Sequence, residues 1–120
     1  VKKTVMSLTN FNVVHAQPDS DLVVLHCWHG NEMVLVFIPV IHLDDYFKSK
    51  HLTGKQANLI AESNIKALSS IASAKFERGE IRPYSRFGAT LPSVRITLED
   101  ILESGEVLND SILETGFNCV

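Results

Sequence analysis

The chain has 120 residues, of which 45% are hydrophobic and 21% charged, with a formal net charge of −3. This length excludes two independent cores, and the composition excludes an intrinsically disordered chain. The basic residues are scattered rather than clustered, which is not the pattern of a general nucleic-acid binder, so we expect no nucleic-acid partner. We predict a single domain over residues 1–120, with residues 106–120 as a C-terminal extension.

The sequence shows no targeting signal, and from this we predict a cytoplasmic location. Residues 1–9 carry no apolar run or cleavage site of a secretory signal. The longest apolar stretch, residues 33–41, is too short to span a bilayer and contains Pro39. Cys27 and Cys119 are too few for the disulfide framework of a secreted domain, so we expect two reduced thiols and no membrane association.

The first elements predicted are strands. Residues 11–15 favour a strand that ends in the turn-forming residues 17–20. Leu22–Trp28 and Met33–Ile38 are rich in β-branched and aromatic residues, and the Gly-Asn pair between them is typical of a type II′ hairpin loop. That loop predicts a register that pairs His29 with Glu32. Because both faces of these strands are apolar, we expect the hairpin at the centre of a sheet that is covered on both sides.

A long helix is predicted next, from Thr53 to about Arg78, after a short amphipathic turn at residues 42–47. Thr53 and Gln56 form a capping box, and Gly79 supplies a left-handed stop. Asn64 falls in the middle of a buried apolar stripe, with Lys75 at the end of that stripe. Its members recur at helical spacing: Ala57, Ile60, Ala61, Leu68, Ile71 and Ala72.

The C-terminal third predicts two strands and a helix. The segment after Gly79, up to Phe87, is extended and contains Pro83, which favours an edge strand. Residues 93–96 predict a short last strand, and Thr97 with Asp100 caps a helix that stops at Gly105. The whole order predicts an α+β fold: a largely antiparallel sheet with a central hairpin, one long helix across a face and a short C-terminal helix.

The middle of the chain resembles a known family. The features that carry the likeness are a turn, Leu43 to Phe47, a helix with an inward Asn64, and the runs Ile71 to Gly79 and Val94 to Asp100. Over roughly residues 22–100 the chain resembles the small bacterial proteins grouped as domain of unknown function family 1488. Ile65 stands where members of that family often carry Arg. The resemblance implies an α+β fold and brings no established activity.

No motif of catalysis or metal binding is complete in the sequence. His26, Cys27 and His29 are close together, but His26 and Cys27 point to opposite faces of a strand and no second pair has zinc-like spacing. A buried strand cysteine such as Cys27 is an inert hydrophobe. There is no phosphate-binding glycine loop, nucleophile elbow or dinucleotide fingerprint. We therefore expect no catalytic residue, no metal and no cofactor.

Several polar residues are nevertheless candidates for binding. Asn64 must satisfy its amide inside an apolar stripe, by bonding a backbone group at a strand end or by binding a ligand. Arg82, Tyr84 and Arg86 alternate, so they share one strand face, which suits an acidic partner, a phosphate or a single-stranded nucleic acid, or is only an exposed edge.

These observations predict a non-catalytic interaction protein that binds a macromolecular partner or itself as a homodimer. The mean hydropathy of +0.09 is high for so small a chain, which favours apolar surface covered by a partner. The alternative is a small-ligand binder or an enzyme with a polar-lined pocket near the hairpin end. The candidate ligand-binding residues are His26, His29, Asn64, Arg82, Tyr84 and Arg86.

Overall fold

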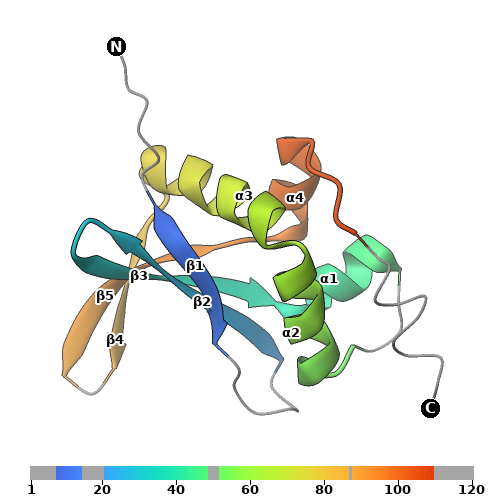
Figure 1. The fold of residues 1–120 in the computed structure, drawn as a ribbon, viewed down its shortest axis with the longest axis horizontal. Helices are drawn as coiled ribbons and strands as arrows, with labels where there is room; N and C mark the ends of the chain where they lie inside the picture. Colours follow the sequence, from blue (N-terminus) through green and yellow to red (C-terminus); the bar gives the residue numbers. More distant parts are fainter. Residues whose placement is uncertain (1–7, 15–20, 49–51, 87, 110–120) are drawn as a thin grey trace.

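The structure is a computed structural model and describes residues 8–14, 21–48, 52–86 and 88–109. Within them the strands form one five-stranded sheet with the order β1-β2-β3-β5-β4 (Figure 1). The bounds are β1 Thr9–Val14, β2 Leu22–His29, β3 Glu32–Pro39, β4 Arg82–Arg86 and β5 Ala89–Arg95. All neighbouring pairs are antiparallel except β3 with β5, which is parallel. The α+β fold with a largely antiparallel sheet is therefore confirmed.

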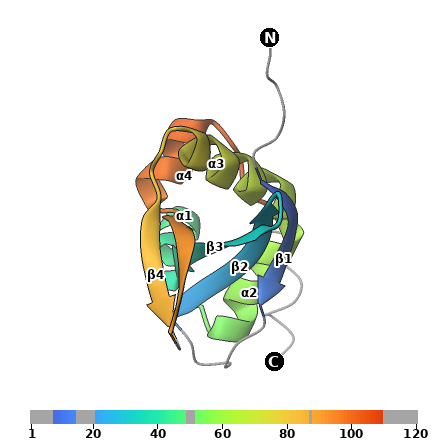
Figure 2. The same ribbon diagram turned by 90° about the vertical axis from the view of Figure 1, so that its left-hand side faces the viewer.

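The central hairpin has the predicted register. His29 lies opposite Glu32 and Cys27 opposite Val34, and Gly30 has a φ of +64°, the left-handed value that a type II′ loop requires at its first position. β4, which contains Pro83, lies at one edge of the sheet and β1 at the other (Figure 2). An edge position suits Pro83 because proline has no N–H to give to a second neighbour.

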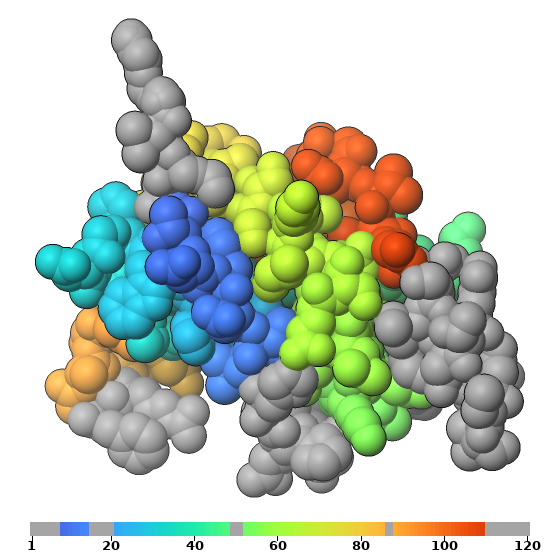
Figure 3. Space-filling model, in the orientation of Figure 1, coloured from blue at the N-terminus to red at the C-terminus, as the bar shows by residue number. Residues whose placement is uncertain are grey.

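The helices are α1 Val40–Phe47, α2 Gly54–Ser63, α3 Ile65–Glu77 and α4 Leu98–Ser104. The predicted capping boxes are present at Thr53 and Thr97, and Gly105 ends α4 with a φ of +79°. Helices α2 and α3 contact β1, and Figure 3 shows this strand lying against them at the surface. Within the described residues, no helix is long and apolar enough to cross a membrane.

The prediction of one helix from Thr53 to Arg78 was wrong. Asn64 interrupts it with φ −118° and ψ 26°, so that α2 ends and α3 begins at this residue. The side-chain Nδ2 of Asn64 donates to the carbonyl of Ile60 at 2.9 Å, where it competes with the backbone ladder. The last strand is also longer than predicted, because β5 begins at Ala89 rather than at residue 93.

Within the described residues the helices cover one face of the sheet, so the predicted second covering layer is not found among them. Side chains of β2 alternate between buried and half-buried, as expected when one face meets the helices and the other does not. On the helix side, Leu25, Cys27, Val34 and Val94 join one core with Ile60 and Leu68. We call the opposite side the open face. By register its side chains include Val14, Leu22, Val24, His26, Trp28, Met33, Leu35, Phe37, Arg82, Tyr84, Leu91, Ser93 and Arg95.

Candidate binding site

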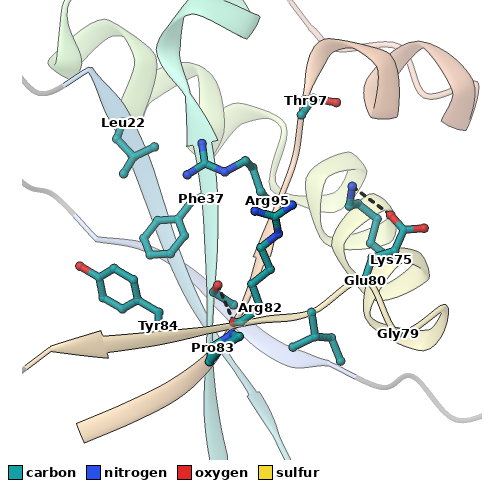
Figure 4. A pocket seen from close by; sticks show the side chains of 12 residues that line it. Leu22, Phe37, Lys75, Gly79, Glu80, Arg82, Pro83, Tyr84, Arg95 and Thr97 are labelled. Carbon is teal, nitrogen blue, oxygen red and sulfur yellow. Dashed lines mark hydrogen bonds and ion pairs between the residues drawn. The ribbon is translucent and has the colours of Figure 1, made fainter. Parts of the chain in front are cut away.

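A cavity of about 550 Å³ lies at one end of the open face. Its walls come from β3, β4 and β5 and from the connection between α3 and β4, and Figure 4 shows two guanidinium groups, of Arg82 and Arg95, among the side chains that line it. We call it the arginine pocket. Its volume lies in the range of roughly 300–1,000 Å³ that small-molecule sites have.

The sheet register brings the two arginines together. Arg82 pairs with Ser93 across β4 and β5, and Arg95 lies two residues beyond Ser93 on the same side of β5. Both side chains are exposed. Within the described part of the chain, neither guanidinium has an ion-pair or hydrogen-bond partner. Two uncompensated cations therefore converge on one cavity.

Aromatic rings form the apolar wall of the arginine pocket. Phe37 and Tyr84 stack in a tilted arrangement, with ring centroids 5.0 Å apart. Phe37 is next to Arg95 on the parallel strand pair, and only 8% of its surface is exposed. Tyr84 is half-buried at the edge of the sheet. Apolar ring and guanidinium therefore lie next to each other, an arrangement that suits a ligand with an anionic group beside an apolar part.

The wall on the helix side is a network of ion pairs. Lys75 Nζ lies 2.6 Å from Asp100 Oδ2 and 3.1 Å from Glu80 Oε1. Asp100 Oδ2 also accepts the backbone N–H of Thr97 at 2.8 Å. Partial burial raises the pKa of Asp100, but the hydrogen bonds from Lys75 and Thr97 outweigh it, so the pKa lies below its ordinary value. The ammonium of Lys75 is thus already neutralised, and the pocket's free positive charge belongs to the arginines.

The hydroxyl groups of Ser93 and Thr97 on the pocket wall have structural partners. Ser93 Oγ donates to the carbonyl of Arg82 at 2.9 Å, which fixes the start of β4 on β5. Thr97 Oγ1 lies 3.0 Å from Asp100 Oδ2 within the cap of α4. These contacts hold the two arginine-bearing strands and the α4 cap in place around the cavity.

The structure separates the candidate residues that the sequence grouped. Arg82 and Tyr84 line the arginine pocket, and His26 lies on the same open face, where its buried Nδ1 has no hydrogen-bond partner among the described residues. His29 points to the helix side, with its ring 4.9 Å from that of Phe76. Arg86 pairs with Ala89 at the end of β4, and its side chain lies outside the described part of the structure.

Asn64 belongs to a different region. Its amide binds the backbone of Asn109, beyond α4, rather than the predicted strand end. The expected pocket near the hairpin end, with His29 and Asn64 in its lining, is therefore not one site: these two side chains take no part in lining the arginine pocket.

Arg95 and Phe37 are pocket residues that the sequence reasoning missed. Alternation along residues 93–95 places Arg95 on the same side as Ser93, which is a usable signal. Nothing local, however, indicates that β5 pairs in parallel with β3, and that pairing is what brings Arg95 next to Phe37.

Metal and thiol chemistry find little support elsewhere in the fold. Within the described ranges, no group of three or more His, Cys, Asp or Glu side chains could hold a metal ion. Cys27 is a free, fully buried thiol whose Sγ lies 3.5 Å from the carbonyl of Val34. Burial raises its pKa to about 12, so the nucleophilic thiolate is scarce at neutral pH.

The comparisons with known proteins add no assignment to this geometry. The chain matches no family model, no curated protein and no solved structure. Its resemblance to family 1488 stays a prediction.

Proposed function

We propose that the chain is a non-catalytic binding protein and that the arginine pocket receives an anionic group of its partner. The observation that carries this proposal is the convergence of Arg82 and Arg95 without a counter-ion in the described residues. Guanidinium groups are planar donors that bind a carboxylate or a phosphate through paired hydrogen bonds. The engagement of Ser93 and Thr97 in structural hydrogen bonds supports binding rather than nucleophilic chemistry.

The anionic group can belong to a small ligand or to a protein partner, and the two differ in the surface that the rest of the molecule contacts. A small ligand would place its apolar part against Phe37 and Tyr84 inside the cavity, whereas a protein partner would supply a carboxylate and extend over the open face. Phenyl phosphate and benzoate represent the first source, because each joins an anion to one ring. Occupation of the pocket can be followed directly by NMR, through the backbone amide chemical shifts of Arg82, Ser93, Arg95 and Thr97.

The test compares wild type with the double variant Arg82→Gln, Arg95→Gln and with Lys55→Gln as control. Lys55 is exposed on α2, away from the pocket, so this change removes a positive charge without touching the site. For wild type and the control, we expect amide chemical shifts at the pocket that saturate with ligand concentration. In the double variant the affinity should fall about tenfold or more, which corresponds to ~1.4 kcal/mol or more of binding free energy. Shifts that are absent, or that survive loss of both arginines, would contradict the proposal.

Self-association is a second candidate, which the sequence also predicts. The observation that favours it is the exposure of Ile41, Leu102 and Val107, with 62%, 62% and 83% of their surfaces exposed. They lie on α1, on α4 and just after α4, and α1 contacts α4. A two-fold pair that covered these side chains would leave the open face accessible. The expected cytoplasmic location is likewise a proposal, which the free thiol of Cys27 supports.

A further inference from the structure

The arginine pocket continues into an apolar surface on the open face. Phe37, in the pocket wall, pairs with Val24, and the rows beyond it pair His26 with Leu35 and Trp28 with Met33. Val24, Leu35, Met33 and Trp28 are only half-buried. The cavity is therefore the cationic end of a longer apolar strip that runs along the central hairpin.

The shape and length of this strip suit a helix. The described helices α2 and α3 cover one face of the sheet, and a sheet with two apolar faces is completed by a second layer. From Leu22 to Trp28 the strip is roughly 20 Å long at about 3.4 Å per residue. A helix of about fourteen residues has that length at 1.5 Å per residue.

A second copy of this chain does not complement the charge of the strip. The described strand side chains on the open face include no carboxylate, and the ionised groups among these described side chains are Arg82 and Arg95. Two copies placed face to face would bury guanidinium groups without counter-ions, which is strongly unfavourable. The occupant must bring its own negative charge.

The remaining apolar surface favours protein side chains over nucleotide bases. Single-stranded nucleic acids need exposed aromatic faces for stacking and cations that follow the backbone. Here the Phe37 ring is only 8% exposed, and Trp28 and Tyr84 are half-buried. The two arginines without a partner among the described residues gather at one end instead of following the strip. We propose that the open face docks an acidic amphipathic helix of another protein. The aliphatic stripe of that helix lies on the apolar strip, and one of its carboxylates enters the arginine pocket. This inference rests on the proposed function and names its partner class.

Trp28 provides the readout. It is the one tryptophan of the chain and lies on the strip, half-buried, so a docked helix changes its emission. The probe is a displayed library of helix-forming peptides of about fourteen residues, selected on the wild-type protein and then measured as synthetic peptides without tryptophan. Enriched peptides are expected to carry an aliphatic stripe and an Asp or Glu at one end, and to shift Trp28 emission to shorter wavelength.

The variants separate this inference from the proposed function. Binding of enriched peptides should fall about tenfold or more in Arg82→Gln, Arg95→Gln and in Val24→Ser, and should be unchanged in Lys55→Gln, with unfolding curves confirming that each variant is folded. Peptides without acidic residues, peptides that bind without the arginines, or tighter binding of oligo-deoxythymidine would overturn the helix proposal. When the helix proposal fails in one of these ways, the phenyl phosphate titration decides the proposed function. Arginine-dependent binding of phenyl phosphate in the pocket would leave the proposed function standing, whereas no binding would overturn both proposals.

Discussion

Asn64 binds the backbone of Asn109 through both ends of its side-chain amide. Its Nδ2 donates to the carbonyl of Asn109 at 3.1 Å, and its Oδ1 accepts the N–H of the same residue. One residue earlier, the N–H of Leu108 donates to the Tyr46 hydroxyl at 3.0 Å, and Leu108 is buried. The hydrogen bonds of Asn64 thus hold Asn109, which follows α4, against the junction of α2 and α3.

Replacement of Asn64 by Leu should destabilise the protein. The change removes both hydrogen bonds to Asn109 and the bond to Ile60 at a buried position, so we expect a loss of about 1–3 kcal/mol in the free energy of unfolding. Urea unfolding followed by circular dichroism measures it. Ser63→Ala, one residue away and exposed, is the control and should cost much less. Equal stability of Asn64→Leu and wild type would show that these hydrogen bonds contribute nothing to the free energy of unfolding.

The Lys75–Asp100 pair should make stability depend on pH. Because the pKa of Asp100 is lowered on folding, its contribution is present above the unfolded value of about 4 and is lost as pH falls through the folded value. Asp100→Asn should therefore cost about 1–3 kcal/mol near neutral pH, and the difference from wild type should shrink in acid. Glu99→Gln, an exposed change in the same helical turn, is the control. A difference that does not vary with pH would contradict a stabilising contribution from the ionised carboxylate of Asp100.

Cys27 should resist thiol reagents in the folded protein. Its side chain is fully buried and burial raises the pKa to about 12, so both access and thiolate are lacking. In a Cys119→Ser background, labelling by a disulfide reagent at mildly alkaline pH should be slow and should become fast in denaturing urea. Rapid labelling under native conditions would mean that β2 opens readily, and would count against an inert core thiol.

Sedimentation should show whether the chain forms the homodimer predicted from its composition. Truncation after Gly105 is unsuitable, because it removes the buried Leu108 and the Asn109 contacts. Leu102→Glu changes an exposed side chain instead, so it should weaken a dimer and leave the unfolding free energy nearly unchanged. Residues 112, 113 and 117 are apolar and could contribute to such a dimer. They lie outside the described residues, and truncation after Asn109 tests them separately. A monomer at micromolar concentration would exclude the second candidate.

The features that could be predicted from the sequence are those set by neighbours in the chain. The register of the hairpin follows from Gly30, and the starts of α2 and α4 follow from the Thr53 and Thr97 capping boxes. The edge position of β4 follows from Pro83. In each case the residue acts through backbone geometry within a few positions, so local chemistry suffices.

The features that could not be predicted depend on distant partners. An Asn in an apolar stripe indicates a needed hydrogen bond, but its partner Asn109 lies at the far end of the described chain. Apolar residues on both faces of β2 and β3 predict two covering layers, whereas the described fold supplies one. Arg82 was identified as a candidate from alternation along β4, but its convergence with Arg95 required the register of β4 on β5.

The parallel pairing of β3 with β5 makes the arginine pocket a late product of folding. The hairpins β2–β3 and β4–β5 each form from neighbouring strands, but Phe37 belongs to the first and Arg95 to the second. Joining them requires closure of the long loop that contains α1, α2 and α3, which costs chain entropy before any contact repays it. An anion held between the two halves would therefore stabilise the closed sheet by mass action. A nascent chain that has not yet released β5 has the hairpin β2–β3 and the helices α1 to α3, but it cannot form the arginine pocket.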